Sequence, residues 1–215
     1  MPNLGLWQLD RLEWKNELLN NISSRQVAEN ITFPYNESLE DFEYRNTFVE
    51  GKFIDNTQTF FFRPNLSGQS GYNVISAFKT IDDSVIYVDI GWIPFEQKEN
   101  IDFLDIDYNK NFSLKGILIS SKERNIFSPE NDYIKNIWYT LSSTEMNQFY
   151  KLNGSFFILK IIDQNYFEQT LIEFNPTQIP NNHLQYAGTW FLLFIVVGVL
   201  YFYQVYQIIR IKWNT

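Results

Sequence analysis

The chain of 215 residues contains no cysteine and a single histidine, His183. The missing thiols exclude disulfide scaffolds, zinc–thiolate sites, iron–sulfur clusters and thiol nucleophiles. One imidazole also excludes any site that needs two, such as the two-histidine metalloprotease motif. Basic residues are scarce, because 17 of them stand against 25 acidic residues and leave a net charge of −8. This charge argues against a nucleic-acid partner, whose phosphates require basic patches.

A run of 26 uncharged residues, Leu184–Ile209, lies near the C-terminus. A helix needs roughly 20 mainly apolar residues to cross the hydrocarbon of a bilayer, so this run is long enough. We therefore expect a transmembrane helix over residues 183–209, and a buried core helix is the alternative. Aromatic residues gather toward its ends, as they do at membrane interfaces: Trp190, Tyr201, Tyr203, Tyr206 and Trp213.

The charges around this run predict its orientation. Arg210 and Lys212 follow it directly, whereas every acidic residue of the chain lies before position 174. By the positive-inside rule, the tail 210–215 faces the cytoplasm, or the matrix in a mitochondrion. Residues 23–180 then form a domain on the opposite side of the membrane. Its acidity predicts a domain tethered to the bilayer rather than adsorbed on anionic lipid.

The N-terminal segment, residues 1–22, carries a helical pattern. Steps of three and four residues place two tryptophans, two leucines and an arginine on one face. Such a face suits a helix that leaves a membrane interface, and the alternative is a soluble amphipathic helix packed on the domain. Too few residues precede it for a membrane span or a signal peptide. The residues of this face are Leu4, Trp7, Arg11, Trp14 and Leu18.

The middle of the chain is typical of short strands, rich in β-branched and aromatic residues and bounded by Gly, Pro, Asn or Asp. Both faces of the segment 71–79 are half apolar, as in a small barrel or a sandwich. We predict a membrane-anchored α+β fold: a mainly antiparallel β-domain, barrel-like or sandwich, between an interfacial N-terminal helix and a transmembrane helix. The predicted strands are Tyr44–Ile54, Gln58–Arg63, Tyr72–Lys79, Val85–Ile90, Ser113–Ser120, Ile137–Thr140, Ser155–Ile162 and Phe167–Phe174.

Three shorter segments complete this prediction. Asp82-Asp83 indicates a hairpin turn between two strands. Ser142 or Ser143 could cap a short helix over residues 145–152. The polar segment 95–111 is predicted to be a loop.

The carboxylates of this chain form no recognisable chemical motif. Asp102, Asp105 and Asp107 cluster, but a calcium loop counted from Asp105 would need Gly and Glu where Lys110 and Gly116 stand. No spacing singles out a pair of carboxylates for acid–base catalysis. The sequence therefore predicts a solvated loop at this cluster and no enzyme.

His183 lies at the outer end of the predicted span. On a helix it shares one stripe with Tyr186 and Trp190. A neutral imidazole beside aromatic rings at apolar depth is suited to bind the iron of a haem. The alternative is an interfacial histidine that hydrogen-bonds only water or a backbone carbonyl.

Four segments resemble the Surfeit-locus-1 family, the cytochrome c oxidase assembly proteins. They are LGLWQLDRLEWK at 4–15; GYNVISAF with VIYVDIGWIP at 85–94; FSLKGIL with FSPENDYIKNIWY; and NNHLQYAGTWF. Their order and spacing cover nearly the whole chain. Ile90 stands where the family usually has an arginine. The family's first membrane span is missing, so we expect the true start to lie upstream of Met1.

The resemblance implies a chaperone rather than an enzyme. It would bind haem a transiently and assist its insertion into cytochrome c oxidase subunit I, with haem a synthase and membrane lipid as further partners. The domain would be periplasmic on a bacterial inner membrane, or face the intermembrane space from the mitochondrial inner membrane. The alternative is a structural assembly factor that stabilises a subunit I intermediate without binding haem.

The resemblance also suggests roles for individual residues. His183 matches the histidine thought to ligate haem, with Tyr186 and Trp190 beside it. Trp7, Gln8 and Arg11 match the family's first motif and would form the membrane-side wall of the site. Arg11 or Lys15 could pair with the haem propionates. The box Gly91, Trp92 and Pro94 would shape the domain.

Overall fold

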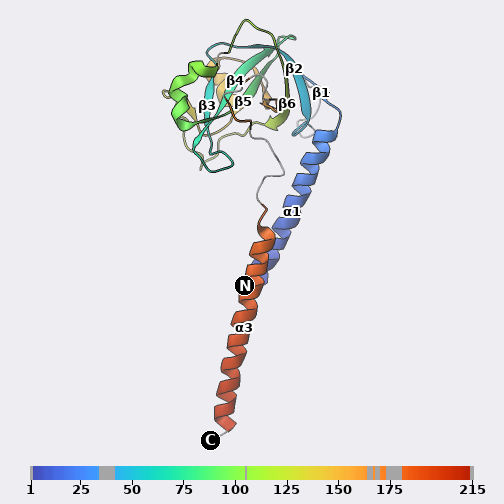
Figure 1. The fold of residues 1–215 in the computed structure, drawn as a ribbon, viewed down its shortest axis with the longest axis vertical. Helices are drawn as coiled ribbons and strands as arrows, with labels where there is room; N and C mark the ends of the chain where they lie inside the picture. Colours follow the sequence, from blue (N-terminus) through green and yellow to red (C-terminus); the bar gives the residue numbers. More distant parts are fainter. Residues whose placement is uncertain are drawn as a thin grey trace. The chain divides into compact units, whose positions relative to one another are not determined.

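The computed structural model describes residues 2–33, 42–104, 106–163, 167, 170–172 and 181–213. The chain divides into two compact units, residues 1–23 with 175–215 and residues 24–174. Figure 1 shows long helices in the first unit and the described strands in the second.

The C-terminal helix α3 (His183–Trp213) confirms the predicted helix and extends past its expected end at residue 209. Its segment His183–Ile211 is long and apolar enough to cross a membrane, by length and composition. The most apolar window of this segment has no buried residue, and its large side chains are exposed, for example Phe202 at 71%. Such an apolar exterior is unusual for a helix surrounded by water.

The N-terminal helix α1 (Pro2–Val27) contains the predicted tryptophan face. The Arg11 guanidinium carbon lies 5.6 Å from the ring centre of Trp7 and 5.4 Å from that of Trp14. The helix extends past the predicted end at residue 22, and its last turn belongs to the second unit. There the Arg25 guanidinium donates a hydrogen bond of 3.1 Å to the carbonyl of Glu43.

Within the first unit, α1 and α3 pack side by side in opposite directions. Gly5, near the start of α1, is buried against the ring of Phe191. Further along α1, Asn16 accepts a hydrogen bond of 3.1 Å from Asn181, just before α3 begins. A small residue such as glycine lets two helices approach closely, because its missing Cβ leaves room for the neighbouring side chain.

In its described residues, the second unit contains eight strands, a short α-helix, α2 (Ser143–Tyr150), and a 3₁₀ helix. The strand order is β1-β2-β6-β8-β5-β4-β3-β7, and β2 also pairs with β4. Five strands therefore close into a barrel, which decides between the predicted barrel and sandwich. The strands are β1 (Ile31–Thr32), β2 (Asn46–Phe53), β3 (Thr59–Phe62), β4 (Gly71–Thr80), β5 (Val85–Pro94), β6 (Phe112–Ser120), β7 (Ile137–Trp138) and β8 (Gly154–Ile161).

Alternating side chains of the barrel strands form two cores. On β4, Val74 and Phe78 belong to the main core, whereas Ile75 and Ala77 belong to a second cluster on the other face. Met146 of α2 and the segment around β7 cover this second cluster. The half-apolar character of both faces of β4 follows from this arrangement, because both faces are buried.

The predicted local elements agree with the structure in most places. The Asp82-Asp83 turn connects β4 and β5, and Asp83 has a positive φ of 63°. Ser142 is the N-cap of α2, and its hydroxyl accepts a hydrogen bond from the amide of Glu145. Such a cap satisfies an amide that the first turn of a helix leaves unpaired.

One further prediction needs correction, and two fall partly or wholly outside the residues that the structure describes. The segment predicted as a loop over 95–111 begins with a 3₁₀ helix, η2 (Phe95–Leu104). A 3₁₀ helix is stabilised by short-range hydrogen bonds and needs no apolar periodicity, so this polar sequence did not predict it. The last predicted strand, 167–174, lies mostly outside the described residues, although Leu171 forms a bridge with Trp92. The side chains of Asp102 and Asp105 are also outside them.

A charged cluster is buried on the outer face of the barrel. The Lys160 ammonium of β8 lies 3.2 Å from a carboxylate oxygen of Asp89 on β5. Asn73 of β4 donates its amide hydrogens to both oxygens of the same carboxylate, at 2.9 and 2.8 Å. The Asp89 carboxylate also accepts a hydrogen bond from the backbone of Gly91. These contacts satisfy the buried carboxylate and join three neighbouring strands.

The Gly-Trp-x-Pro box shapes this part of the barrel. Gly91 has a φ of 132°, and a Cβ there would collide with the side chain of Thr170. The buried indole of Trp92 donates a hydrogen bond of 2.8 Å to the carbonyl of Arg63. Ile90, at the position of the family's arginine, is fully buried in the main core. An arginine would not fit such an apolar interior without a partner.

Candidate functional site

The first turn of α3 brings His183 against α1. Its Nδ1 atom lies 2.7 Å from the side-chain oxygen of Gln8, and the imidazole is half-buried. The two residues are separated by 175 positions, so only the pairing of the two helices joins them. The structure therefore brings together two of the predicted site residues.

This contact sets the chemistry of the imidazole. The amide oxygen of Gln8 accepts a hydrogen bond here when the neutral imidazole of His183 carries its proton on Nδ1. In the neutral ring the Nε2 atom then keeps its lone pair, which is the form that binds a metal. A histidine that ligates a metal commonly donates its other N–H in this manner, which orients the ring.

Arg11 contacts two tryptophan rings of α1. Its guanidinium lies over Trp7 and Trp14, at distances typical of cation–π contacts. Both indoles remain about half exposed, Trp7 at 49% and Trp14 at 53%. This face of α1 therefore offers flat aromatic surface and a positive charge to whatever lies beside it.

The residues of the predicted aromatic stripe of α3 differ in exposure. Trp190 is half-buried, but Tyr186 is 56% exposed. Among the described residues, no hydrogen bond or ring contact joins either of them to His183. The buried positions beside α1 are instead Ala187 and the ring of Phe191, which contacts Gly5.

Sequence reasoning missed these inter-helix contacts. Gly5 and Phe191 meet, and so do Asn16 and Asn181, but neither pair shows in the spacing of one helix. The glycine within LGLW was the one available signal, because small residues mark close helix contacts.

Comparison with known proteins places these features in a family. The sequence matches the SURF1 family over residues 1–195. A SURF1-like protein of Rickettsia felis is 31% identical over 205 residues, which cover 93% of this chain and 89% of that protein. A SURF1-like protein of Dictyostelium discoideum is 26% identical, covering 93% and 90%. Surfeit locus protein 1 of Homo sapiens is 27% identical, covering 93% and 72%. The chain belongs to the SURF1 family.

Proposed function

We propose that this protein is a membrane-anchored assembly factor of cytochrome c oxidase that holds haem a for insertion into subunit I. The observation that carries the proposal is the contact between His183 and Gln8, which prepares the sole imidazole of the chain as a metal ligand. Family membership supports the assignment to oxidase assembly. Subunit I and haem a synthase are the partners that such a carrier would need.

The length and composition of α3 support anchoring of the protein in a membrane. Its exposed apolar surface is stable in lipid and unfavourable in water, and its length suits one crossing. Arg210 and Lys212 at its end favour the cytoplasmic or matrix side for the C-terminus. The β-domain would then lie in the periplasm of a bacterium or in the intermembrane space of a mitochondrion.

The residues of the helix pair fit a haem. His183 would hold the haem a iron through its Nε2 atom, because its Nδ1 atom faces Gln8. Gln8 would hold the imidazole in the required tautomer. The indoles of Trp7 and Trp14 offer apolar contact area, and Arg11 is a partner for propionates.

A carrier needs a ligand that it can give up. One imidazole at the edge of a helix pair binds less tightly than two axial ligands in a closed pocket, and this suits transfer to an acceptor. Trp7 and Trp14 are about half exposed, so the face of α1 that carries them is open to lipid or to a partner. We propose no catalytic step for this chain.

The ligand role can be tested on the full-length protein purified in detergent from cells that make haem a. The His183→Ala variant should lose most of its haem, measured by the pyridine haemochrome spectrum. Gln185→Ala, an exposed change in the same helical turn, serves as the matched control and should keep it. An unchanged haem content and visible spectrum in His183→Ala would remove His183 from the mechanism.

Gln8 gives a second and finer test. Gln8→Leu removes the acceptor of the imidazole proton, so haem affinity should fall by about 10-fold or more. Gln8→Glu keeps an acceptor and should retain haem with an altered reduction potential. A colourless wild-type protein that still supports oxidase assembly would favour the alternative, a structural factor that binds subunit I alone.

A further inference from the structure

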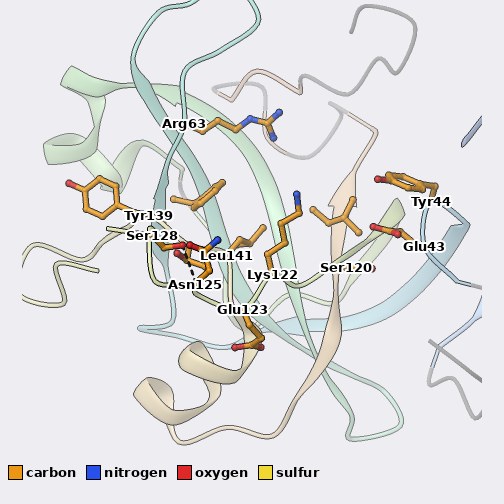
Figure 2. A pocket seen from close by; sticks show the side chains of 13 residues that line it. Glu43, Tyr44, Arg63, Ser120, Lys122, Glu123, Asn125, Ser128, Tyr139 and Leu141 are labelled. Carbon is orange, nitrogen blue, oxygen red and sulfur yellow. Dashed lines mark hydrogen bonds between the residues drawn. The ribbon is translucent and has the colours of Figure 1, made fainter. Parts of the chain in front are cut away.

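The β-domain contains a cavity that the helix pair does not share. Its volume is about 560 Å³, and all of its walls belong to the second unit. It lies where β3 and β6 end, beside the segments 122–128 and 139–141. Figure 2 shows the side chains that line it.

Two cations, Arg63 and Lys122, line this cavity from separate parts of the chain. Figure 2 shows the Lys122 ammonium and the Arg63 guanidinium directed into the same space. Among the described residues neither side chain forms an ion pair or a hydrogen bond, in contrast with Arg124, which pairs with two glutamates. The lining also holds Glu43 and Glu123, so the two cations are available to an outside anion only where these carboxylates are engaged elsewhere.

Hydrogen bonds fix the main chain at Arg63 and at Lys122. The amide of Arg63 donates to the carbonyl of Gly71 at 3.0 Å, and its carbonyl accepts from the Trp92 indole. The amide of Lys122 donates to the carbonyl of Leu141 at 2.9 Å. The main chain that carries each side chain is therefore fixed, and the loss of side-chain freedom is the remaining entropy cost of binding.

The two acidic residues of the wall, Glu43 and Glu123, each interact with other side chains. The Glu123 carboxylate accepts hydrogen bonds from Ser142 at 3.0 Å and Thr144 at 2.8 Å, at the start of α2. Figure 2 shows it directed away from Lys122. On the opposite wall, burial and the Glu43 carboxylate raise the pKa of Tyr44, so its phenol stays protonated.

Apolar surface adjoins the cations. Phe61 and Tyr139 contribute aromatic walls. The segment that carries Lys122 continues into a turn that displays Ile126 at 90% and Phe127 at 89% exposure. Asn125 orders this turn, because its side-chain oxygen accepts a hydrogen bond of 2.9 Å from the backbone amide of Phe127. Two large apolar side chains fixed in a turn and facing solvent are typical of an interaction surface.

We propose that this cavity binds a segment of a partner protein in which a carboxylate is flanked by large apolar side chains. Arg63 and Lys122 would bind the carboxylate through charge-assisted hydrogen bonds. The aromatic walls and the Ile126–Phe127 turn would cover the apolar neighbours. Charge complementarity selects an acidic segment over a basic one, and the apolar rim selects a peptide over a bare anion.

The test uses ligand-observed fluorine NMR on the full-length protein in detergent. The probe is the peptide acetyl-Gly-(4-fluoro-Phe)-Glu-Leu-Gly-amide, and its partner peptide has Gln in place of Glu. The Glu peptide should bind at least about 10-fold more tightly, because charge-assisted hydrogen bonds are lost with Gln. Equal binding of the two peptides, or binding of neither, would overturn the proposal.

Variants locate the binding to the cavity. Arg63→Gln and Lys122→Gln should each weaken the Glu peptide by about 10-fold. Lys52→Gln, an exposed cation on β2 outside the cavity, is the matched control and should not change its affinity. The circular dichroism spectrum and the haem content of the variants should match the wild type, which separates this site from the helix pair.

A last comparison distinguishes a peptide site from an anion site. Sodium phosphate and sodium acetate, at equal ionic strength, should displace the peptide only at far higher concentration than unlabelled Glu peptide does. Displacement by phosphate as effective as by the peptide would show a site for small anions and would overturn the proposed partner. Unchanged peptide binding in both Arg63→Gln and Lys122→Gln would do the same.

Discussion

The two units of this chain place their apolar side chains in opposite environments. In the barrel, residues such as Val74, Phe78 and Ile86 are fully buried. On α3, side chains of equal hydrophobicity are exposed, for example Leu192 at 62% and Ile195 at 59%. The barrel therefore supplies its own apolar environment, whereas α3 requires one from outside. Stability of the two units should accordingly respond to different changes.

The largest effect is expected from the buried charge of the barrel. Asp89→Ala leaves the Lys160 ammonium buried without its partner, which should lower the free energy of unfolding by about 3–5 kcal/mol. Chemical denaturation followed by near-ultraviolet circular dichroism measures it. The double variant Asp89→Leu with Lys160→Met should recover most of the loss. A single-variant loss below about 1 kcal/mol would show that water reaches Lys160.

A smaller effect is expected where the helices meet. Gly5→Leu places a side chain where the ring of Phe191 lies, and overpacking of this kind costs about 1–3 kcal/mol. Cysteines introduced at Asn16 and Asn181 report the pairing by thiol cross-linking, with no native cysteine to interfere. Gly188→Leu is the control, because nothing lies within 4 Å of that position. Equal cross-linking in both variants would contradict the contact.

The barrel should also weaken in alkali. Burial, with Tyr150 nearby, raises the pKa of Tyr87 well above its ordinary value near 10. Its contribution is therefore complete below pH 10 and decreases above it, by about 1.4 kcal/mol per pH unit until the raised pKa is reached. Urea unfolding of the wild type and Tyr87→Phe between pH 8 and 11.5 isolates this slope. Parallel pH profiles for the two proteins would exclude Tyr87 as the cause.

The smallest effect is expected at the surface of the barrel. Lys79 and Asp83 form an ion pair of 2.8 Å, and the hydrogen bond from Lys79 lowers the pKa of Asp83. Both side chains are exposed, so solvent screens the attraction. Asp83→Asn should leave the midpoint of urea unfolding unchanged. A clear loss would mean that the β4–β5 turn contributes more than its exposure indicates.

Local elements of this fold were predictable from sequence because local chemistry determines them. The alternation in β4, the Asp82-Asp83 turn and the Ser142 cap each depend on a few neighbouring residues. The closure of the barrel was not predictable. A sandwich buries alternate side chains equally well, and only the pairing of β2 with β4 as well as with β6 closes the ring of strands.

The same limit applies to the candidate site. The sequence and the resemblance drew attention to His183 and Gln8 separately, but their contact depends on helix packing. The spacing of His183, Tyr186 and Trp190 predicted one stripe, but it could not show that Ala187 and Phe191 pack beside α1. The Arg63–Lys122 cavity left no sequence signal, because two isolated cations far apart in a chain form no motif.

The closure of the barrel leaves little free edge on the sheet. In the described part of the chain, the outermost strands of the sheet, β1 and β7, have two residues each. The outer strands therefore offer few unpaired backbone groups with which a neighbouring molecule could form a strand pair. Short outer strands of this kind protect the sheet against edge-to-edge pairing between copies.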